Sequence, residues 1–167
     1  MNAHQVSVAA ESFTAALFAW SGFDISVQYG ANQPEYDLVV VNGSQMLKVS
    51  VKGSQDGAWG LSQGYKKGRS YHDAAEMWVE KHTKKTIVCL VQFKGVDIRK
   101  GELPRVYIAT PEEIGKKLKA SRNGHGETIL KENHTWTRGV GKGYSENIPE
   151  EWRFSKERLN YLLKWKS

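Results

Sequence analysis

The amino-acid sequence predicts an α/β domain in which a mixed β-sheet is flanked by helices. Three observations support this class: a helical pattern of apolar residues over 5–20, a hairpin signal at Asn42-Gly43, and the continuous apolar run "TIVCLVQF" over 86–93. The expected element order is α-β-β-β-α-β-β-α, followed by a loop and a last helix. Because three strands precede the second helix, we expect a mixed sheet and not a regular alternation of strand and helix.

The first expected helix covers residues 5–20. Apolar residues recur on one face at helical spacing: Val6, Ala10, Phe13, Leu17 and Trp20. Much of the opposite face is also apolar, which predicts a helix buried nearly all round. Glu11 is the only charged residue in it. Trp20, like Trp78 and Trp165 further along the chain, is expected to pack in the core.

The next elements are three strands. Residues 25–30 are expected to form the first, and 36–51 a hairpin with a two-residue turn at Asn42-Gly43. That turn pairs Asp37 with Lys48, whereas a loop two residues longer sets Asp37 opposite Ser50. In either register one face of the sheet carries the polar side chains Asp37, Lys48, Ser50 and Lys52.

The rest of the chain alternates between loops and regular elements. The sequence predicts a Gly- and Ser-rich loop over 53–70, a helix over 71–82, strands over 85–93 and 105–110, a Gly-rich loop over 121–151 and a helix over 156–165. The clearest helix start is Thr110, an N-cap followed by Pro111, with Glu113 able to close a capping box.

The 167 residues are expected to form a single domain, 1–167, with a core at about 5–120 and the Gly-rich loop and last helix at 121–167. Charge is uneven: the first 47 residues contain four acidic and no basic residues, and all 24 Lys and Arg follow. A basic body favours a polyanion such as nucleic acid as partner. A lysine-rich surface that only keeps the protein soluble is the alternative.

Two further features concern the compartment. Cys89 is the single cysteine and has no partner for an intramolecular disulfide, which favours a reducing environment. No apolar run approaches the about 20 residues of a membrane span. The first 47 residues also lack the basic start of a signal peptide. We therefore expect a cytoplasmic protein without membrane contact.

The polar face of the hairpin suggests a chemistry. A carboxylate such as Asp37 beside a lysine on a neighbouring strand can hold a divalent cation and a water together, as phosphodiester hydrolysis requires. Glu11 is a further candidate, because a carboxylate on a buried helix is costly unless it is paired. The alternative is a plain ion pair between Asp37 and Lys48 at the sheet end, with Glu11 reaching solvent.

The pattern "E11 … D37 … S50-V51-K52", placed on a helix and two hairpin strands, resembles the PD-(D/E)XK phosphodiesterase superfamily with its restriction-endonuclease-like fold. The layout is most similar to the Holliday-junction resolvase branch, and the resemblance covers about residues 5–120. It implies a restriction-endonuclease-like mixed sheet and a nuclease that uses weakly bound Mg²⁺ or Mn²⁺.

The resemblance also implies roles for individual residues. Asp37 corresponds to the metal-binding aspartate, Lys52 to the lysine that positions or activates the attacking water, and Glu11 to a helix carboxylate found in some members. The main-chain carbonyl of Val51 corresponds to a further metal ligand. Ser50 stands where the family usually has an acid, so the expected site carries one negative charge less.

Two other acidic residues could substitute for the missing acid at position 50. Glu35 lies two residues before Asp37 on the same face, and Asp56 in the following loop is the weaker candidate. The expected metal ligands are therefore Asp37, Val51, Glu11 and Glu35.

Basic residues beside aromatic ones are candidates for nucleic-acid contacts. The expected binding residues are Lys48, Lys66, Lys67, Arg69, Arg138 and Lys142, and the accompanying aromatics are Trp59, Tyr65, Trp136 and Tyr144. The alternative is that the aromatics hold loops onto the core. A second acidic and histidine-containing group, His125, His134, Glu127 and Glu132, lacks a recognised metal-ligand spacing and is expected to be a solvated loop.

Two functions follow as expectations. The first is a metal-dependent endonuclease acting on DNA or RNA, with DNA the first expectation. The second is a catalytically inactive relative that serves as a nucleic-acid-binding or protein-interaction module, since fold does not fix function. A second copy of the chain is a candidate partner in either case.

Overall fold

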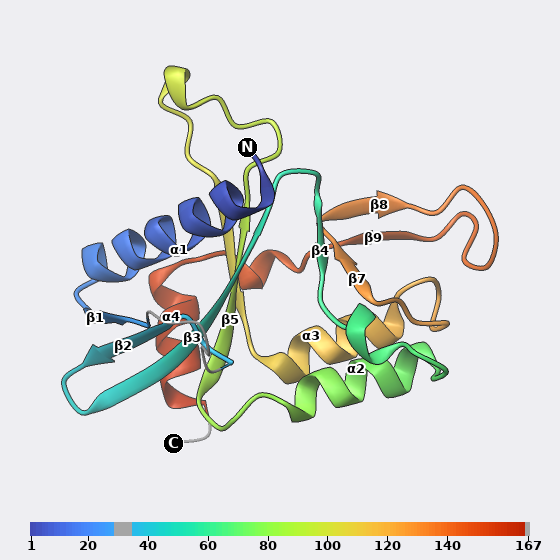
Figure 1. Cartoon of the computed structure of the whole chain (residues 1–167), viewed down its shortest axis with the longest axis horizontal. Coiled ribbons are helices and arrows are strands. Elements are labelled where there is room, and N and C mark those ends of the chain that lie inside the picture. Colours follow the sequence, from blue (N-terminus) through green and yellow to red (C-terminus); the bar gives the residue numbers. More distant parts are fainter. Residues whose placement is uncertain (29–34, 166–167) are drawn as a thin grey trace.

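The computed structural model describes residues 1–28 and 35–165, with a mixed five-stranded sheet at its centre (Figure 1). The strands, in the order in which they lie side by side, are β1 (Asp24–Val27), β2 (Leu38–Asn42), β3 (Gln45–Ser54), β5 (Thr86–Gln92) and β6 (Arg105–Ala109). Only the pair β3 and β5 is parallel, and the other pairs of this sheet are antiparallel. The expected α/β class with a mixed sheet is confirmed.

Helices cover both faces of the sheet. The four α-helices are α1 (Ala3–Trp20), α2 (Tyr71–Glu80), α3 (Pro111–Ala120) and α4 (Lys156–Lys164), and short 3₁₀ helices lie at Gln63–Tyr65, Ile98–Lys100 and Glu150–Trp152. One buried cluster joins α1 and α4 to one face, and a second joins α2 and α3 to the other. Among the described residues, no helix is long and apolar enough to cross a membrane.

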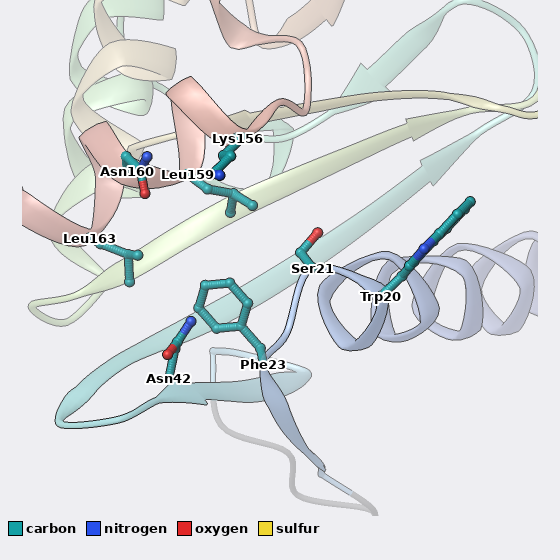
Figure 2. Close-up of a pocket in the computed structure, with 8 residues that line it drawn as sticks. All are labelled: Trp20, Ser21, Phe23, Asn42, Lys156, Leu159, Asn160 and Leu163. Atoms are coloured by element: carbon teal, nitrogen blue, oxygen red, sulfur yellow. The ribbon is translucent and has the colours of Figure 1, made fainter.

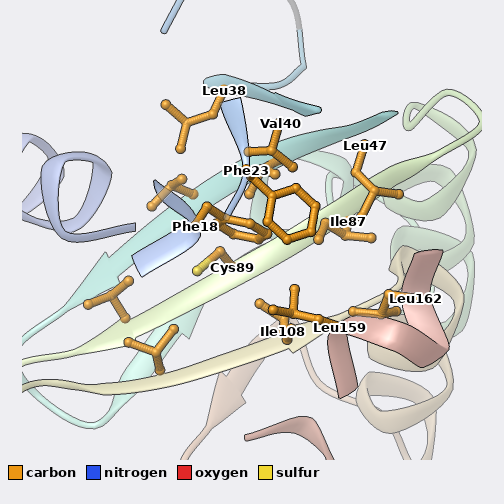
Figure 3. Close-up of a cluster of buried hydrophobic side chains, with 14 of the residues drawn as sticks. Phe18, Phe23, Leu38, Val40, Leu47, Ile87, Cys89, Ile108, Leu159 and Leu162 are labelled. Carbon is orange, nitrogen blue, oxygen red and sulfur yellow. The ribbon is translucent and has the colours of Figure 1, made fainter. Parts of the chain in front are cut away.

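The two buried clusters arise from the alternation of side chains along the central strands. Leu47, Val49 and Val51 of β3 join the cluster under α1 and α4, part of which is seen in Figure 3. Every residue of β5 is buried, with Ile87 in that cluster and Val88 in the other. The continuous apolar run therefore forms a strand covered on both faces, as expected.

Helix α1 differs from its prediction in two ways. It begins earlier, because Asn2 caps it and forms a capping box with Gln5. It is also not buried all round: Val8 is 48% exposed and Trp20 is 86% exposed. The helix lies on the outside of the sheet, so only one face contacts the core. The packing assignment was thus wrong for Trp20, whereas Trp78 is buried as expected.

The hairpin register also differs from the first prediction. Asn42 pairs with Gln45, so the turn residues are Gly43 and Ser44. Gly43 has φ +60°, which suits a turn with positive φ at its first central residue, where glycine carries no steric cost. The shift of two residues places Lys48 opposite Val39 instead of Asp37. The strand pairing is the one expected for a loop two residues longer, although the turn itself has two residues because Asn42 and Gln45 also pair. Each side chain therefore stays on its expected face of the sheet.

The two segments expected as loops contain short strands. Within 53–70 and 121–151 the structure forms β4 (Ala58–Gly60), β7 (Ile129–Lys131), β8 (Asn133–Thr135) and β9 (Ser145–Asn147). They pair as β4 with β7 and β8 with β9, outside the main sheet. Strands of three residues are too short for a recognisable alternation pattern, which explains why they were missed.

An ion pair attaches the β7–β8 segment to the main sheet. Arg105 on β6 donates two hydrogen bonds to the carboxylate of Glu132, at 2.7 and 2.9 Å, and the hydroxyl of Tyr107 donates another at 2.8 Å. Burial alone would raise the pKa of Glu132, but these hydrogen bonds outweigh it and lower the pKa below its usual 4.5. The ionised carboxylate therefore stabilises the fold.

We expect Glu132→Gln to lower the free energy of unfolding by about 1–3 kcal/mol at pH 7, because Arg105 loses its charged partner. The folded-state pKa is lowered, so the stabilisation is complete above pH 4.5 and is lost as the pH falls through the lower folded value. Urea unfolding of both proteins from pH 7 to 3 should show the difference shrinking in acid. A difference independent of pH would contradict this role.

Candidate active site

The candidate site lies along the edge of β3 beside the point where its partner strand β2 begins. Leu38 is the first residue of β2 and pairs with Val49. One residue earlier, the main-chain N–H of Asp37 donates to the carbonyl of Val49 at 2.9 Å. The Asp37 carboxylate in turn accepts the N–H of Val51, with 2.6 Å between Oδ2 and N. The side chain of Asp37 thus continues the pairing of the two strands and is held against β3.

A groove of about 250 Å³ opens beside this part of β3, and its lining includes Val51, Lys52, Ser7 and Ala58. Lys52 is half-buried there, and its main-chain carbonyl accepts the indole N–H of Trp59 at 3.0 Å. In an extended strand the N–H and C=O of one residue point to the same edge. The carbonyl of Val51 therefore faces the edge at which its N–H meets Asp37.

Helix α1 forms the opposite wall of the groove because Gly53 lets it approach. A Cβ at position 53 would lie 2.8 Å from Val6 Cγ1 and 2.9 Å from Ala10 Cβ. One turn of α1 carries both Ser7 and Glu11, and the Ser7 hydroxyl donates to the Glu11 carboxylate at 3.0 Å. Glu11 is therefore hydrogen-bonded to a residue that lines the groove. No ion pair to Asp37 or Lys52 is found for it within the described residues.

Two predicted site residues do not join this arrangement. Ser50 lies on β3 two residues before Lys52 and is only 1% exposed, so its hydroxyl does not reach the surface. Glu35 accepts hydrogen bonds from the main chain and hydroxyl of Thr83, the former at 3.1 Å, and pairs with Lys48 at 3.7 Å. Burial raises the pKa of Glu35, but these contacts outweigh it and lower the pKa.

The ion pair of Lys48 is therefore made with Glu35 and not with Asp37, which corrects the pairing expected from the shorter turn. Lys48 also donates to the hydroxyl of Thr83, and its amine lies 5.4 Å from the centre of the Tyr36 ring. These contacts bind the start of β2 to the connection between α2 and β5. Lys48 and Glu35 thus act as structural residues in the arrangement described.

The sequence did not point to Lys81, which follows the last residue of α2. Burial lowers the pKa of Lys81, repulsion from Lys52 lowers it further, and Glu35 and Asp37 act in the opposite direction. A second lysine thus shares the electrostatic environment of Asp37 and Lys52. A lysine at a helix C-terminus also complements the helix dipole, so its position gave no functional signal.

The donor set fits one divalent cation better than two. Across residues 1–28 and 35–165 no group of three or more His, Cys, Asp or Glu side chains is placed to hold a metal. The Asp37 carboxylate and the Val51 carbonyl, however, lie at the same edge of β3. Mg²⁺ commonly takes only one or two protein carboxylates and completes its shell with water and phosphate oxygens. Asp56 does not contribute, because it caps the turn by accepting from Ala58 N–H at 3.0 Å.

The second group of possible ligands does not converge. Glu132 is bound by Arg105, and Glu127 lies 3.9 Å from Arg122 and accepts the N–H of Thr128. The ring of His134 packs edge-on to Trp136.

The expected nucleic-acid contacts lie in two loops. Lys66, Lys67 and Arg69 precede α2, and Arg138 and Lys142 lie between β8 and β9. Trp59 is buried in the core and contacts Tyr107, so it is a packing residue.

A larger hollow, about 370 Å³, lies between the end of α1 and α4 (Figure 2). Its lining includes Phe23, Leu159 and Leu163, and Lys156 is the charged residue among those lining it. Neither hollow has a carboxylate in its lining. The groove beside β3 is the better candidate for chemistry, because Val51 lines it and binds the Asp37 carboxylate through its N–H.

Comparison with known proteins does not assign the chain to a family, because no protein-family model and no curated protein matches it.

Proposed function

We propose that this protein is a metal-dependent nuclease that hydrolyses phosphodiester bonds of nucleic acid, DNA first, at a site of the PD-(D/E)XK type. One observation carries the proposal: the carboxylate of Asp37 is hydrogen-bonded to Val51 N–H, directly before Lys52, at the side of a groove. A carboxylate and a main-chain carbonyl thus face one edge of β3, and a lysine is the next residue of the strand.

In this proposal each residue of the site has a separate role. Bound Mg²⁺ or Mn²⁺ would neutralise charge on the phosphate and lower the pKa of a bound water. Asp37 and the Val51 carbonyl would hold that ion. The Lys52 ammonium donates hydrogen bonds to the attacking water or to a phosphate oxygen, and Lys81 adds positive charge where negative charge develops. The hydrogen bond from Trp59 to the carbonyl of Lys52 fixes the backbone that carries the amine.

A second function, a nucleic-acid-binding module without catalysis, is favoured by a different observation. Ser50 replaces the usual acid and is buried, and Glu35 is engaged by Thr83 and Lys48. The site therefore has fewer free carboxylates than a nuclease normally uses. A binding module needs only the basic surface, so the two functions differ in cleavage and agree in binding.

Cleavage of supercoiled plasmid and of branched DNA, measured with Mg²⁺, with Mn²⁺ and with EDTA, tests the proposal. We expect cleavage with Mg²⁺ or Mn²⁺ and none with EDTA. The cleavage rate of Lys52→Ala should be about 10²–10³-fold lower than that of wild type, the cost of removing one hydrogen-bond donor to the transition state. Lys100→Ala, an exposed lysine after β5, is the matched control and should cut like wild type. Equal cleavage by Lys52→Ala would exclude this site. A wild type that binds DNA but never cuts it would favour the second function.

A further inference from the structure

Five side chains outside the candidate active site alternate as cation and aromatic ring. Lys131 lies 5.5 Å from the centre of the Trp136 ring, Arg122 lies 5.3 Å from the same ring and 5.4 Å from that of Tyr71, and Lys66 lies 4.6 Å from Tyr71. We call this series the cation–aromatic ladder. We propose that it binds the phosphate backbone of the nucleic acid and extends the groove at Lys52, an inference that rests on the proposed function.

The ladder is assembled from segments far apart in the chain. Lys66 and Tyr71 flank the start of α2, Arg122 follows α3, Lys131 ends β7 and Trp136 follows β8. All five residues are half-buried. The packing of these segments therefore restricts the movement of the five side chains.

Two glycines allow the segments that carry the ladder to approach one another. At Gly141, with φ +91°, a Cβ would come within 3.0 Å of Arg122 Cα. At Gly126, with φ +83°, a Cβ would come within 2.8 Å of Tyr71 Cβ. Larger residues at these two positions would push the segments apart, so the ladder depends on both glycines.

Within the part of the chain that the structure describes, no ion pair balances the positive charge of Lys66 or Lys131. Lys48 and Arg105 are neutralised by Glu35 and Glu132, whereas Lys66 and Lys131 contact rings. Two acids do face the ladder: Glu127, 3.9 Å from Arg122, and Glu146, which accepts the Trp136 indole N–H at 3.1 Å. Four exposed bases flank it: Lys67, Arg69, Arg138 and Lys142. The surface is therefore positive overall and complements a polyanion.

A pair of short strands connects the ladder with the groove. Ala58 on β4 pairs directly with Lys131 on β7, and Ala58 also lines the groove beside Lys52. The next pair, Trp59 and Leu130, is buried in the core. Because neighbouring residues of a strand point to opposite faces, Ala58 and Lys131 face away from the core on one common surface. The groove and the ladder thus adjoin.

The occupant of the ladder is the backbone and not the bases. The two rings already have cations at their faces, and base stacking needs a free ring face. Ammonium and guanidinium groups held in a row match the charged oxygens of successive phosphates. Binding along the ladder should therefore be independent of base sequence and strongly dependent on salt.

The test compares Lys66→Gln/Lys131→Gln with the control Lys100→Gln/Lys116→Gln, which removes the same charge from exposed positions outside the ladder. Binding of a labelled DNA duplex is measured by anisotropy in EDTA over a range of salt, and thermal melting verifies that each variant is folded. We expect the ladder variant to bind about tenfold more weakly and its salt slope to fall by about two, one per phosphate contact. The control variant should match wild type.

Each other outcome has a distinct meaning. A ladder variant that binds like wild type would overturn the inference and leave the proposed nuclease intact. A wild type that does not bind nucleic acid at all would overturn both. Repeating the titration with a single strand and its abasic counterpart separates backbone from base contacts. A loss seen only on the strand with bases would show stacking and overturn the assignment to the backbone.

Discussion

Asp37→Ala is expected to reduce metal-dependent cleavage by at least about 10²-fold, in line with the loss of one preorganised charged group from an active site. Asp37 is the carboxylate that the fold holds at the edge of β3, because Glu35 is engaged elsewhere and Ser50 carries no charge. DNA binding in EDTA should remain near that of wild type, since the removed group is negative. Cleavage rates and anisotropy on the same substrate measure the two effects separately.

Asp37 also has a structural contact, so the alanine variant alone is ambiguous. Asp37→Asn keeps an oxygen that can accept the N–H of Val51 but removes the negative charge. We expect it to fold like wild type and still to lose cleavage. Asp24→Asn, an exposed aspartate on β1, removes the same charge elsewhere and should cut normally. An active Asp37→Asn would show that the carboxylate charge is not used and would refute the proposed site.

The placement of Asp37 and Lys52 along the hairpin could be predicted even though the predicted turn was wrong, because the side chains of a strand alternate with a period of two. The first prediction of the hairpin register was wrong by two residues, yet a shift of two leaves each side chain on its face. Asp37 and Lys52 therefore come to the same region in either register. The capping box of Thr110 and Glu113 was predictable because it is a local contact between residues three apart in the sequence.

The rest of the site depends on contacts between segments that are distant in the sequence. Glu35 reaches Thr83, 48 residues further along, and Lys81 comes to the site only because α2 packs behind the sheet. The ladder likewise requires the first residue of α2, Tyr71, and the loop after β8 to come together at Arg122. Neither the periodicity of apolar residues nor the capping pattern predicts which distant segments come into contact. The exposed Trp20 was missed because a helix with apolar residues all round does not reveal which face contacts the sheet.

Phe18→Ala is expected to lower the free energy of unfolding by about 3–5 kcal/mol, the usual cost of truncating a buried phenylalanine. Phe18 is fully buried beside Phe23 (Figure 3). Its ring meets those of Phe23 and Phe154 edge-on, at 5.5 and 5.3 Å between centroids. It thus joins α1 to β1 and to the segment before α4. Urea unfolding monitored by circular dichroism measures the loss.

Trp20→Ala on the same helix is the matched control for Phe18→Ala. Trp20 is the larger side chain but is 86% exposed, and its indole points away from α4 in Figure 2, so its removal should change stability by no more than about 0.5 kcal/mol. Similar losses for both variants would mean that α1 packs differently. Because α1 reaches the groove through Val6 and Ala10 at its other end, Phe18→Ala should still cut DNA well below its melting temperature. Cleavage lost in parallel with stability would show instead that the whole helix positions the site.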